Sequence, residues 1–168
     1  MRAKTKRIVR AIYAFRCGYC GVSEAQCGAE LTYDHFRPQS QGGTDTVANL
    51  VYACHACNEF KGDYWSEEEN SRLLHPPTDD LKQHMSEEMD GTLRSISALG
   101  KVFIDRLQLN RPALVEHRLE RQRLAHIENH LAELTVTLRG ILSEIKTKQT
   151  PNPSEQQQEE RTSIGIEI

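Results

Sequence analysis

Two short motifs decide the fold of this chain: CGYC at residues 17–20 and CHAC at residues 54–57. Each C-x-x-C brings two thiols close together, and two such pairs supply the four thiolates of a closed tetrahedral zinc site. Zinc bound in this way stabilises a short segment that has no large apolar core of its own. The intervening residues 21–53 exceed the ~15–20 residues of a plain zinc ribbon. We therefore expect structural zinc on Cys17, Cys20, Cys54 and Cys57, and further chemistry in the segment that they enclose.

The enclosed segment and its end carry an acid, a histidine and two asparagines. Asp34 and His35 are adjacent in LTYDHFRP, Asn49 lies in VANL, and Asn58 directly follows Cys57. Phosphodiester hydrolysis needs a deprotonated water and a cation on the developing charge. A neutral histidine, with an ordinary pKa of ~6.5, accepts that proton near neutral pH. Carboxylate and amide oxygens suit Mg²⁺ or Mn²⁺ and leave coordination positions open, so these residues favour a metal-dependent phosphodiesterase.

In this order and spacing, the segment resembles the HNH endonucleases, the ββα-metal nucleases. Their pattern runs C-x-x-C, then Asp-His or His-His, then Asn, then a second C-x-x-C followed by His or Asn and a downstream basic residue. The resemblance covers roughly residues 15–63. It implies that His35 is the general base, Asp34 a ligand of the catalytic metal, and Asn49 the residue that holds the loop bearing the base.

The chain departs from the name-giving pattern at its last position, where Asn58 replaces histidine. By the resemblance, Asn58 is the second protein ligand of the catalytic Mg²⁺ or Mn²⁺. An Asn directly after C-x-x-C also occurs in the subgroup that is similar to phage endonuclease VII, which cuts branched DNA. Thiolates prefer zinc, so the two metals are expected to sort by ligand softness.

The expected fold class is α+β, a small zinc-stapled ββα-metal module with a basic N-terminal helix and a long C-terminal helical region. LTYDHF and NLVYAC have the β-branched and aromatic content of short strands, and QSQGGT is typical of a glycine-containing loop. Asn58 is expected to open the helix that leads to Lys61. The predicted organisation is a helix at 1–16, the module at 17–65, an accessory segment at 66–110, a long helix at 111–146 and a disordered tail at 147–168.

Six cations and no acidic residue precede Cys17, although the net charge of the chain is −3. Ile8, Ala11, Ile12 and Phe15 follow a helical period, which predicts an amphipathic helix laid on the zinc module. Its basic side is either a phosphate-binding arm or a solvated surface. The expected nucleic-acid-binding residues are Arg2, Lys4, Lys6, Arg7, Arg10, Arg37 and Lys61.

The accessory segment gives only short, local structural signals. WSEEEN predicts a helix start, HPPTDD a turn, EEMDGTL a hairpin turn, and GKVFIDRLQL a short helix or strand. Beyond it, Asn110 and Pro112 predict an N-cap and the first turn of a helix.

Along this last helix, apolar residues recur at alternating steps of three and four, which makes a narrow heptad seam. Its members are Leu124, Ile127, Leu131, Leu134, Leu138, Ile141 and Ile145. The seam predicts a coiled coil with a second copy or with a partner protein; the alternative is a long helix folded back on its own domain. The polar, proline-broken sequence that follows predicts disorder, and SIGIEI at its end is either a docking strand or without a role.

The chain has no apolar run of a length that spans a membrane, and MRAKTKRIVR lacks the apolar core of a signal peptide. Paired cysteines without such a signal predict metal ligands in a reducing compartment, the cytoplasm.

Three function classes follow from the sequence. The first is an HNH endonuclease that cuts DNA within a bacterial or phage defence or recombination system. The second is an RNA-cutting nuclease of the same fold, because base and metal do not read the sugar. The third is a zinc module that binds nucleic acid or a partner without catalysis.

Overall fold

The computed structural model describes residues 1–149. The chain divides into two units, one of residues 1–120 and one that begins at Arg121, and each is described by itself. Most of the predicted tail at 147–168 and all of SIGIEI lie outside the described residues.

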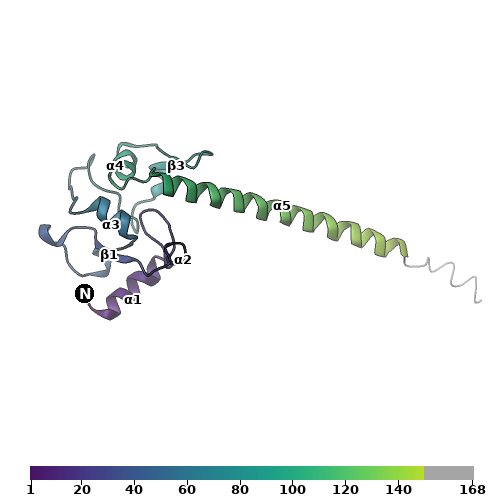
Figure 1. Ribbon diagram of the computed structural model, residues 1–168, viewed down its shortest axis with the longest axis horizontal. Coiled ribbons are helices and arrows are strands. Elements are labelled where there is room, and N and C mark those ends of the chain that lie inside the picture. Colours follow the sequence, from purple (N-terminus) through teal and green to yellow (C-terminus); the bar gives the residue numbers. More distant parts are fainter. Residues whose placement is uncertain (150–168) are drawn as a thin grey trace, which may run out of the picture. The chain divides into compact units, whose positions relative to one another are not determined.

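The centre of the first unit is a short antiparallel hairpin of β1 (Thr32–His35) and β2 (Leu50–Ala53), followed by α3 (His55–Lys61). This is the predicted ββα unit (Figure 1). All four residues of β2 are buried, so the strand is covered on both faces. The expectation that Asn58 opens the helix was wrong: α3 begins at His55, and Asn58 lies in the middle of the helix.

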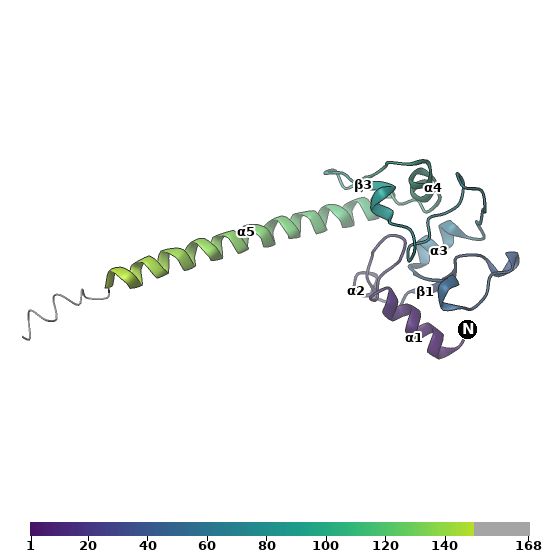
Figure 2. The ribbon, with the colours of Figure 1, turned by 180° about the vertical axis from the view of Figure 1, so that it is seen from behind.

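Helix α1 (Ala3–Ile12) packs beside β2 and lies next to the hairpin in both views (Figures 1 and 2). The predicted helix is present, but its predicted contact face was wrong. Val9 is fully buried and Tyr13 half-buried, whereas Ile8, Ile12 and Phe15 are 40–56% exposed. The helix therefore packs on the module through the face that carries Val9. The face that carries Ile8 and Ile12, which the periodicity indicated, is exposed.

Short elements connect these parts. Helix α2 (Glu24–Cys27) begins with a capping box, in which Ser23 and Gln26 bond each other's backbone N–H. The connection from β1 to β2 contains two 3₁₀ turns, η1 (Gln39–Gln41) and η2 (Val47–Asn49).

The accessory segment packs into the same apolar core as the module. It contains η3 (Leu81–Gln83), the hairpin β3 (Met85–Glu87) and β4 (Leu93–Ser95), and α4 (Ala98–Arg106). The predicted hairpin turn and the helical alternative for GKVFIDRLQL are present, but WSEEEN forms bends and turns rather than a helix start. The buried residues Leu74, Phe103 and Leu107 join Val51 and Tyr52 in one cluster. Small modules bury a low fraction of their surface, and the accessory segment enlarges the apolar core of this one.

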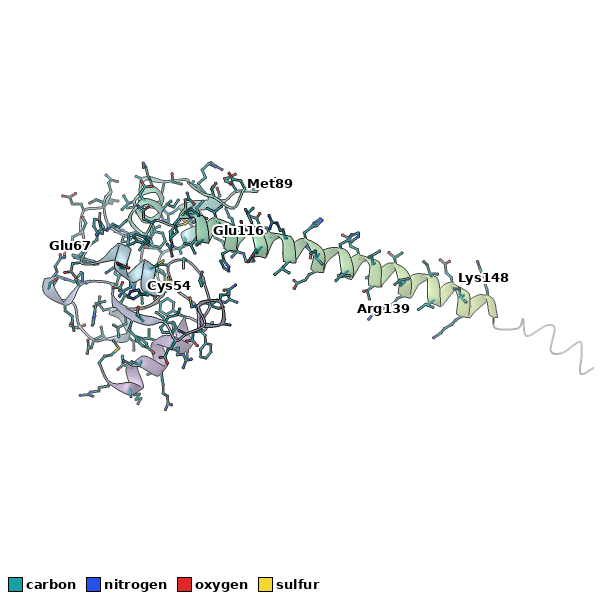
Figure 3. The ribbon with its side chains drawn as sticks, viewed as in Figure 1. Cys54, Glu67, Met89, Glu116, Arg139 and Lys148 are labelled. Atoms are coloured by element: carbon teal, nitrogen blue, oxygen red, sulfur yellow. The ribbon has the colours of Figure 1, made fainter. Side chains whose placement is uncertain are left out.

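Helix α5 runs from Pro112 to Gln149, three residues beyond its expected end. Asn110 is not its N-cap: the Asn110 amide bonds both the N–H and the C=O of Leu93 in β4. The side chains of Arg139 and Lys148 stand on its surface, and Met89 marks the exposed tip of the β3–β4 hairpin (Figure 3). Across residues 1–149, no helix combines the length and the apolar character that a membrane span needs.

Candidate active site and zinc centre

The side chains of Asp34 and His35 project from opposite faces of β1, as those of adjacent strand residues do. Asp34 points inward and is buried, whereas the His35 side chain keeps 20% of its surface exposed. One Asp34 oxygen, Oδ2, accepts a hydrogen bond from the Tyr19 hydroxyl at 2.5 Å. Burial raises the pKa of Tyr19, and the charge of Asp34 raises it further, so the phenol remains the donor.

Lys61 does not lie at the surface, so its predicted contact with phosphate was wrong. Its side chain is fully buried, and its Nζ donates to Asp34 Oδ1 at 3.2 Å, to the His35 carbonyl at 2.9 Å and to the Gly62 carbonyl at 3.3 Å. All three protons of the ammonium thus have partners inside the protein. Lys61 ties the end of α3 to both residues of the Asp-His pair.

The His35 side chain is held by a carboxylate, Asp45, that no sequence motif marks. His35 Nε2 lies 2.8 Å from Asp45 Oδ1, and Gln39 Nε2 donates to the same oxygen at 3.2 Å. The hydrogen bonds from the amino group of Met1 and from His35 lower the pKa of Asp45. Asp45 is ten positions beyond His35 in a glycine-containing loop, where no periodic pattern relates the two residues.

Asn49 fastens this loop at three points. Its Oδ1 accepts from the Arg37 N–H at 2.9 Å, and its Nδ2 donates to the carbonyls of Arg37 at 3.1 Å and Thr44 at 2.9 Å. The same loop passes close to itself at Gly43, where a Cβ would lie 1.8 Å from the Arg37 carbonyl oxygen. Only glycine fits there, so the loop is tightly folded between β1 and β2.

A cleft of about 310 Å³ opens between β1 and the end of α3. Asp34, His35 and Asn58 line it together with Tyr33 and Asp63, and Pro38, Gln39, Ser40 and Gly62 complete the wall. The structure therefore brings the predicted acid, base and amide to one solvent-accessible space. Asp63 is a further carboxylate at this cleft, and no motif in the sequence marks it. Hard oxygen donors beside an imidazole fit a divalent cation that keeps water ligands.

The four predicted zinc ligands meet in one cluster. The sulfurs of Cys17, Cys20, Cys54 and Cys57 all lie within 4.8 Å of one another, and those of Cys20 and Cys54 are 3.7 Å apart. A tetrahedral ion with Zn–S bonds of ~2.3 Å requires sulfur separations of about 3.8 Å. The donor set and its spacing therefore fit zinc.

Arg111, from outside the cysteine frame, supports this cluster. Its Nη2 lies 3.5 Å from Cys57 Sγ and 3.9 Å from Cys54 Sγ, and its guanidinium covers the ring of Phe60. Four thiolates around Zn²⁺ carry a net charge of −2, which a neighbouring cation offsets.

Among the residues in or next to α1 that were predicted to contact phosphate, some have partners within the protein and others are exposed to solvent. Arg10 forms two 2.6 Å hydrogen bonds with Glu24, so its guanidinium already has a partner within the protein, and its contact with nucleic acid stays a prediction. Lys6 lies over the ring of Tyr33, which lines the cleft, and Arg2 lines a second hollow with Asp45. Lys4 and Arg7 are exposed.

Arg37 is also exposed, beside the cleft-bearing loop. Its Nε donates to the Gln41 carbonyl at 2.7 Å, its Nη1 lies 3.7 Å from Glu67, and its guanidinium covers the ring of Trp65.

Comparison with known proteins identifies the segment that carries this site. Residues 17–64 match the family model described as HNH endonuclease. These residues form an HNH endonuclease domain. A similar sequence is the CRISPR-associated endonuclease Cas9 of Corynebacterium diphtheriae, 44% identical over 48 residues that make up 28% of this chain and 4% of that protein. The likeness is thus confined to the HNH domain and covers a small part of the relative. No solved structure gives a significant match.

Proposed function

We propose that the protein is a metal-dependent DNA endonuclease in which His35 acts as the general base. The observation that supports this most directly is the single cleft that His35 shares with Asp34 and Asn58. His35 would accept the proton of the attacking water, and the resulting hydroxide oxygen would bond to the phosphorus as the bond from phosphorus to the leaving sugar oxygen breaks. The leaving oxygen would take up a proton from solvent water. Asp34 and Asn58 would hold one Mg²⁺ or Mn²⁺, which when bound neutralises charge on the scissile phosphate. The zinc centre has no part in this step and secures the hairpin to α3.

The DNA would approach along the side of the domain that α1 forms. Lys6 stands over a ring of the cleft wall, and Arg2 lies against the loop that carries Asp45. These cations flank the cleft, where phosphates on either side of the scissile bond would lie. Arg37 would contact the backbone from the other end of the same loop.

The biological setting that we propose is a bacterial or phage defence or recombination system in the cytoplasm. The resemblance of the HNH domain to a CRISPR-associated endonuclease supports the first of these settings. Four cysteines placed for metal binding, rather than for disulfides, suit a reducing compartment.

The test is cleavage of circular DNA and of folded RNA by the purified full chain, with Mg²⁺, with Mn²⁺ and with a chelator. We expect metal-dependent cutting of DNA that His35→Ala abolishes while zinc content and fold are retained. His55→Ala is the matched control, because His55 is an exposed histidine of the same domain that does not line the cleft. Cutting of RNA alone would assign the second function class. Binding without cutting would assign the non-catalytic class.

A further inference from the structure

The loop between β1 and β2 places the carboxylate of Asp45 next to Nε2 of His35. Asp45 Oδ1 lies 2.8 Å from His35 Nε2, and Gln39 donates to the same oxygen. The family resemblance gives Asp45 no role, and the sequence pattern did not select it. Its position is nevertheless specific, because the loop that bears it is bonded by Asn49 at Thr44, one residue before Asp45.

The chemistry of the pair fixes which histidine nitrogen carries hydrogen. An ionised carboxylate only accepts hydrogen bonds, so Nε2 must be the donor of the 2.8 Å contact. In a neutral imidazole, the other nitrogen then has the free lone pair. The ring of His35 is thereby oriented with Nδ1 as the atom that can accept a proton.

We propose that Asp45 is a positioning residue that holds His35 with Nδ1 as the catalytic base, an assignment that rests on the proposed nuclease function. This proposal also assigns a role to Asn49, which acts on His35 indirectly through the loop. By bonding Arg37 and Thr44, Asn49 fixes the two ends of the loop, and the loop presents Asp45 to His35. Gln39, bonded to the same carboxylate oxygen, limits the rotation of the Asp45 side chain.

If Asp45 had a purely structural role, removal of its carboxylate would lower the stability of the fold. The Asp45 side chain is 41% exposed, and a pair exposed to this extent contributes little to the stability of a fold. Removal of the carboxylate should therefore leave unfolding almost unchanged, while the orientation of the imidazole is lost. The effect should appear in kcat more than in KM, because the side-chain partners of Asp45 are His35 and Gln39, whereas Lys6 and Arg37 on the proposed DNA path do not contact it. The amino group of Met1, which also pairs with Asp45, remains a cation in the variant.

The experiment compares Asp45→Ala and Asp45→Glu with wild type in the full chain. Asp105→Asn is the control, since Asp105 is an exposed carboxylate whose salt bridge is with Lys101 on α4. We expect kcat of Asp45→Ala to fall about 10- to 100-fold, part of the ~10²- to 10⁴-fold that a general base supplies, with KM within about twofold. Asp45→Glu should recover a part of that loss. A kcat of Asp45→Ala equal to that of wild type would overturn the proposal.

A second readout does not depend on cleavage. Nitrogen-15 spectra of the histidines without catalytic metal, assigned with His35→Ala, report which ring nitrogen of His35 carries hydrogen. Wild type should show a slowly exchanging Nε2–H that is lost in Asp45→Ala. Hydrogen on Nδ1 in wild type, or an unchanged Nε2–H signal in Asp45→Ala, would refute the positioning role. If the wild type cuts no nucleic acid, the proposed function fails, and the spectra still decide whether Asp45 orients His35.

Discussion

At the scale of single residues, a buried cation is the least expected feature of the site. Lys61 is fully buried beside Asp34, whose side chain is 7% exposed. Charged side chains lose much hydration energy when buried, and here hydrogen bonds to Asp34 and two carbonyls offset that loss. The pair therefore joins α3 to β1 as long as both partners are present.

Lys61→Met should destabilise the first unit by about 3–5 kcal/mol, because it leaves the Asp34 carboxylate buried without its cation. Lys101→Met is the control, since its pair with Asp105 is exposed on both sides and should contribute only ~0.3–0.5 kcal/mol. Urea unfolding of the zinc-loaded proteins without catalytic metal measures both. Equal midpoints for the two variants would contradict a structural role for the buried pair.

Asn58 is expected to act through the catalytic metal. Asn58→Ala removes an oxygen from the cleft and should raise the half-saturating concentration of Mg²⁺ or Mn²⁺, whereas Asn58→His, the commoner ligand of the family pattern, should retain activity. Cleavage rate measured against metal concentration separates these outcomes. If Asn58→Ala lowers the rate by the same factor at every concentration, the residue acts on the phosphate rather than on the metal.

The sequence predicted those site residues that a spacing rule marks and missed those that only packing brings together. Four cysteines and the Asp-His pair follow such a rule. Asp45 does not, because it meets His35 through an irregular loop. Lys61 was placed at the surface since lysines are rarely buried, and only the joint positions of Asp34 and two carbonyls show why this one is.

At the scale of elements, α1 shows that helical periodicity alone does not identify the buried face of a helix. Two stripes of the helix fit a helical repeat: one through Ile8 and Ile12, the other through Thr5, Val9 and Tyr13. The more apolar stripe was predicted to be buried, yet the second one packs, with Val9 fully buried. The sequence of one helix does not contain the shape of the surface that receives it, so the choice of face could not be made from periodicity.

The basic side of α1 gives a prediction with an internal control. Arg2→Gln with Lys6→Gln should weaken DNA binding about equally over different sequences and lower the slope of log affinity against log salt by roughly 1 for each lost phosphate contact. Arg10→Gln should leave that slope unchanged, because Arg10 is already bonded to Glu24. Binding measured at several salt concentrations provides the test. A fall in slope for Arg10→Gln alone would place the DNA on the opposite side of the helix.

Arg111 lies outside the HNH domain and contacts the cysteine cluster that fits zinc, so we expect it to strengthen zinc binding. Arg111→Met keeps much of the apolar stem but removes the cation at the Cys54 and Cys57 sulfurs. Loss of such an outer partner typically lowers metal affinity about 10- to 100-fold, so zinc should pass faster to a coloured chelator. Arg94→Met is the control, since the Arg94 side chain is 67% exposed and pairs with Glu88. Equal release rates in both variants would mean that the cysteines hold zinc without help from Arg111.

At the scale of the whole molecule, the sequence indicated separate segments where the structure has one folded unit. The match to known proteins ends at residue 64, yet residues as far as Leu114 join the apolar core of the first unit. The accessory segment carries no sustained hydrophobic period, so its burial could not be inferred from a pattern. Its Phe103 packs against Tyr19, which donates a hydrogen bond to Asp34, so the accessory segment also supports the candidate active site.

The second unit consists, in its described part, of α5 residues whose apolar seam is exposed. The seam side chains from Leu124 to Ile145 are 45–60% exposed, and the seam keeps its steps of three and four throughout. Under the proposed function, one site would cut one strand, so association of two chains would let the protein cut both. Seven exposed apolar residues in heptad register fit a coiled coil with a second copy or with a partner protein.

Leu131→Glu with Leu138→Glu puts two charges into the seam and should dissociate an oligomer, since each charge would be buried without a partner. Ala132→Glu with Arg139→Glu adds as many carboxylates outside the seam and serves as the control. Sedimentation should show an oligomer for wild type and control and a monomer for the seam variant. In a plasmid assay, the variant should accumulate nicked circles where wild type yields linear DNA. A monomeric wild type would mean that the seam awaits a different protein, and an unfolded seam variant would mean that these leucines belong to a core within one chain.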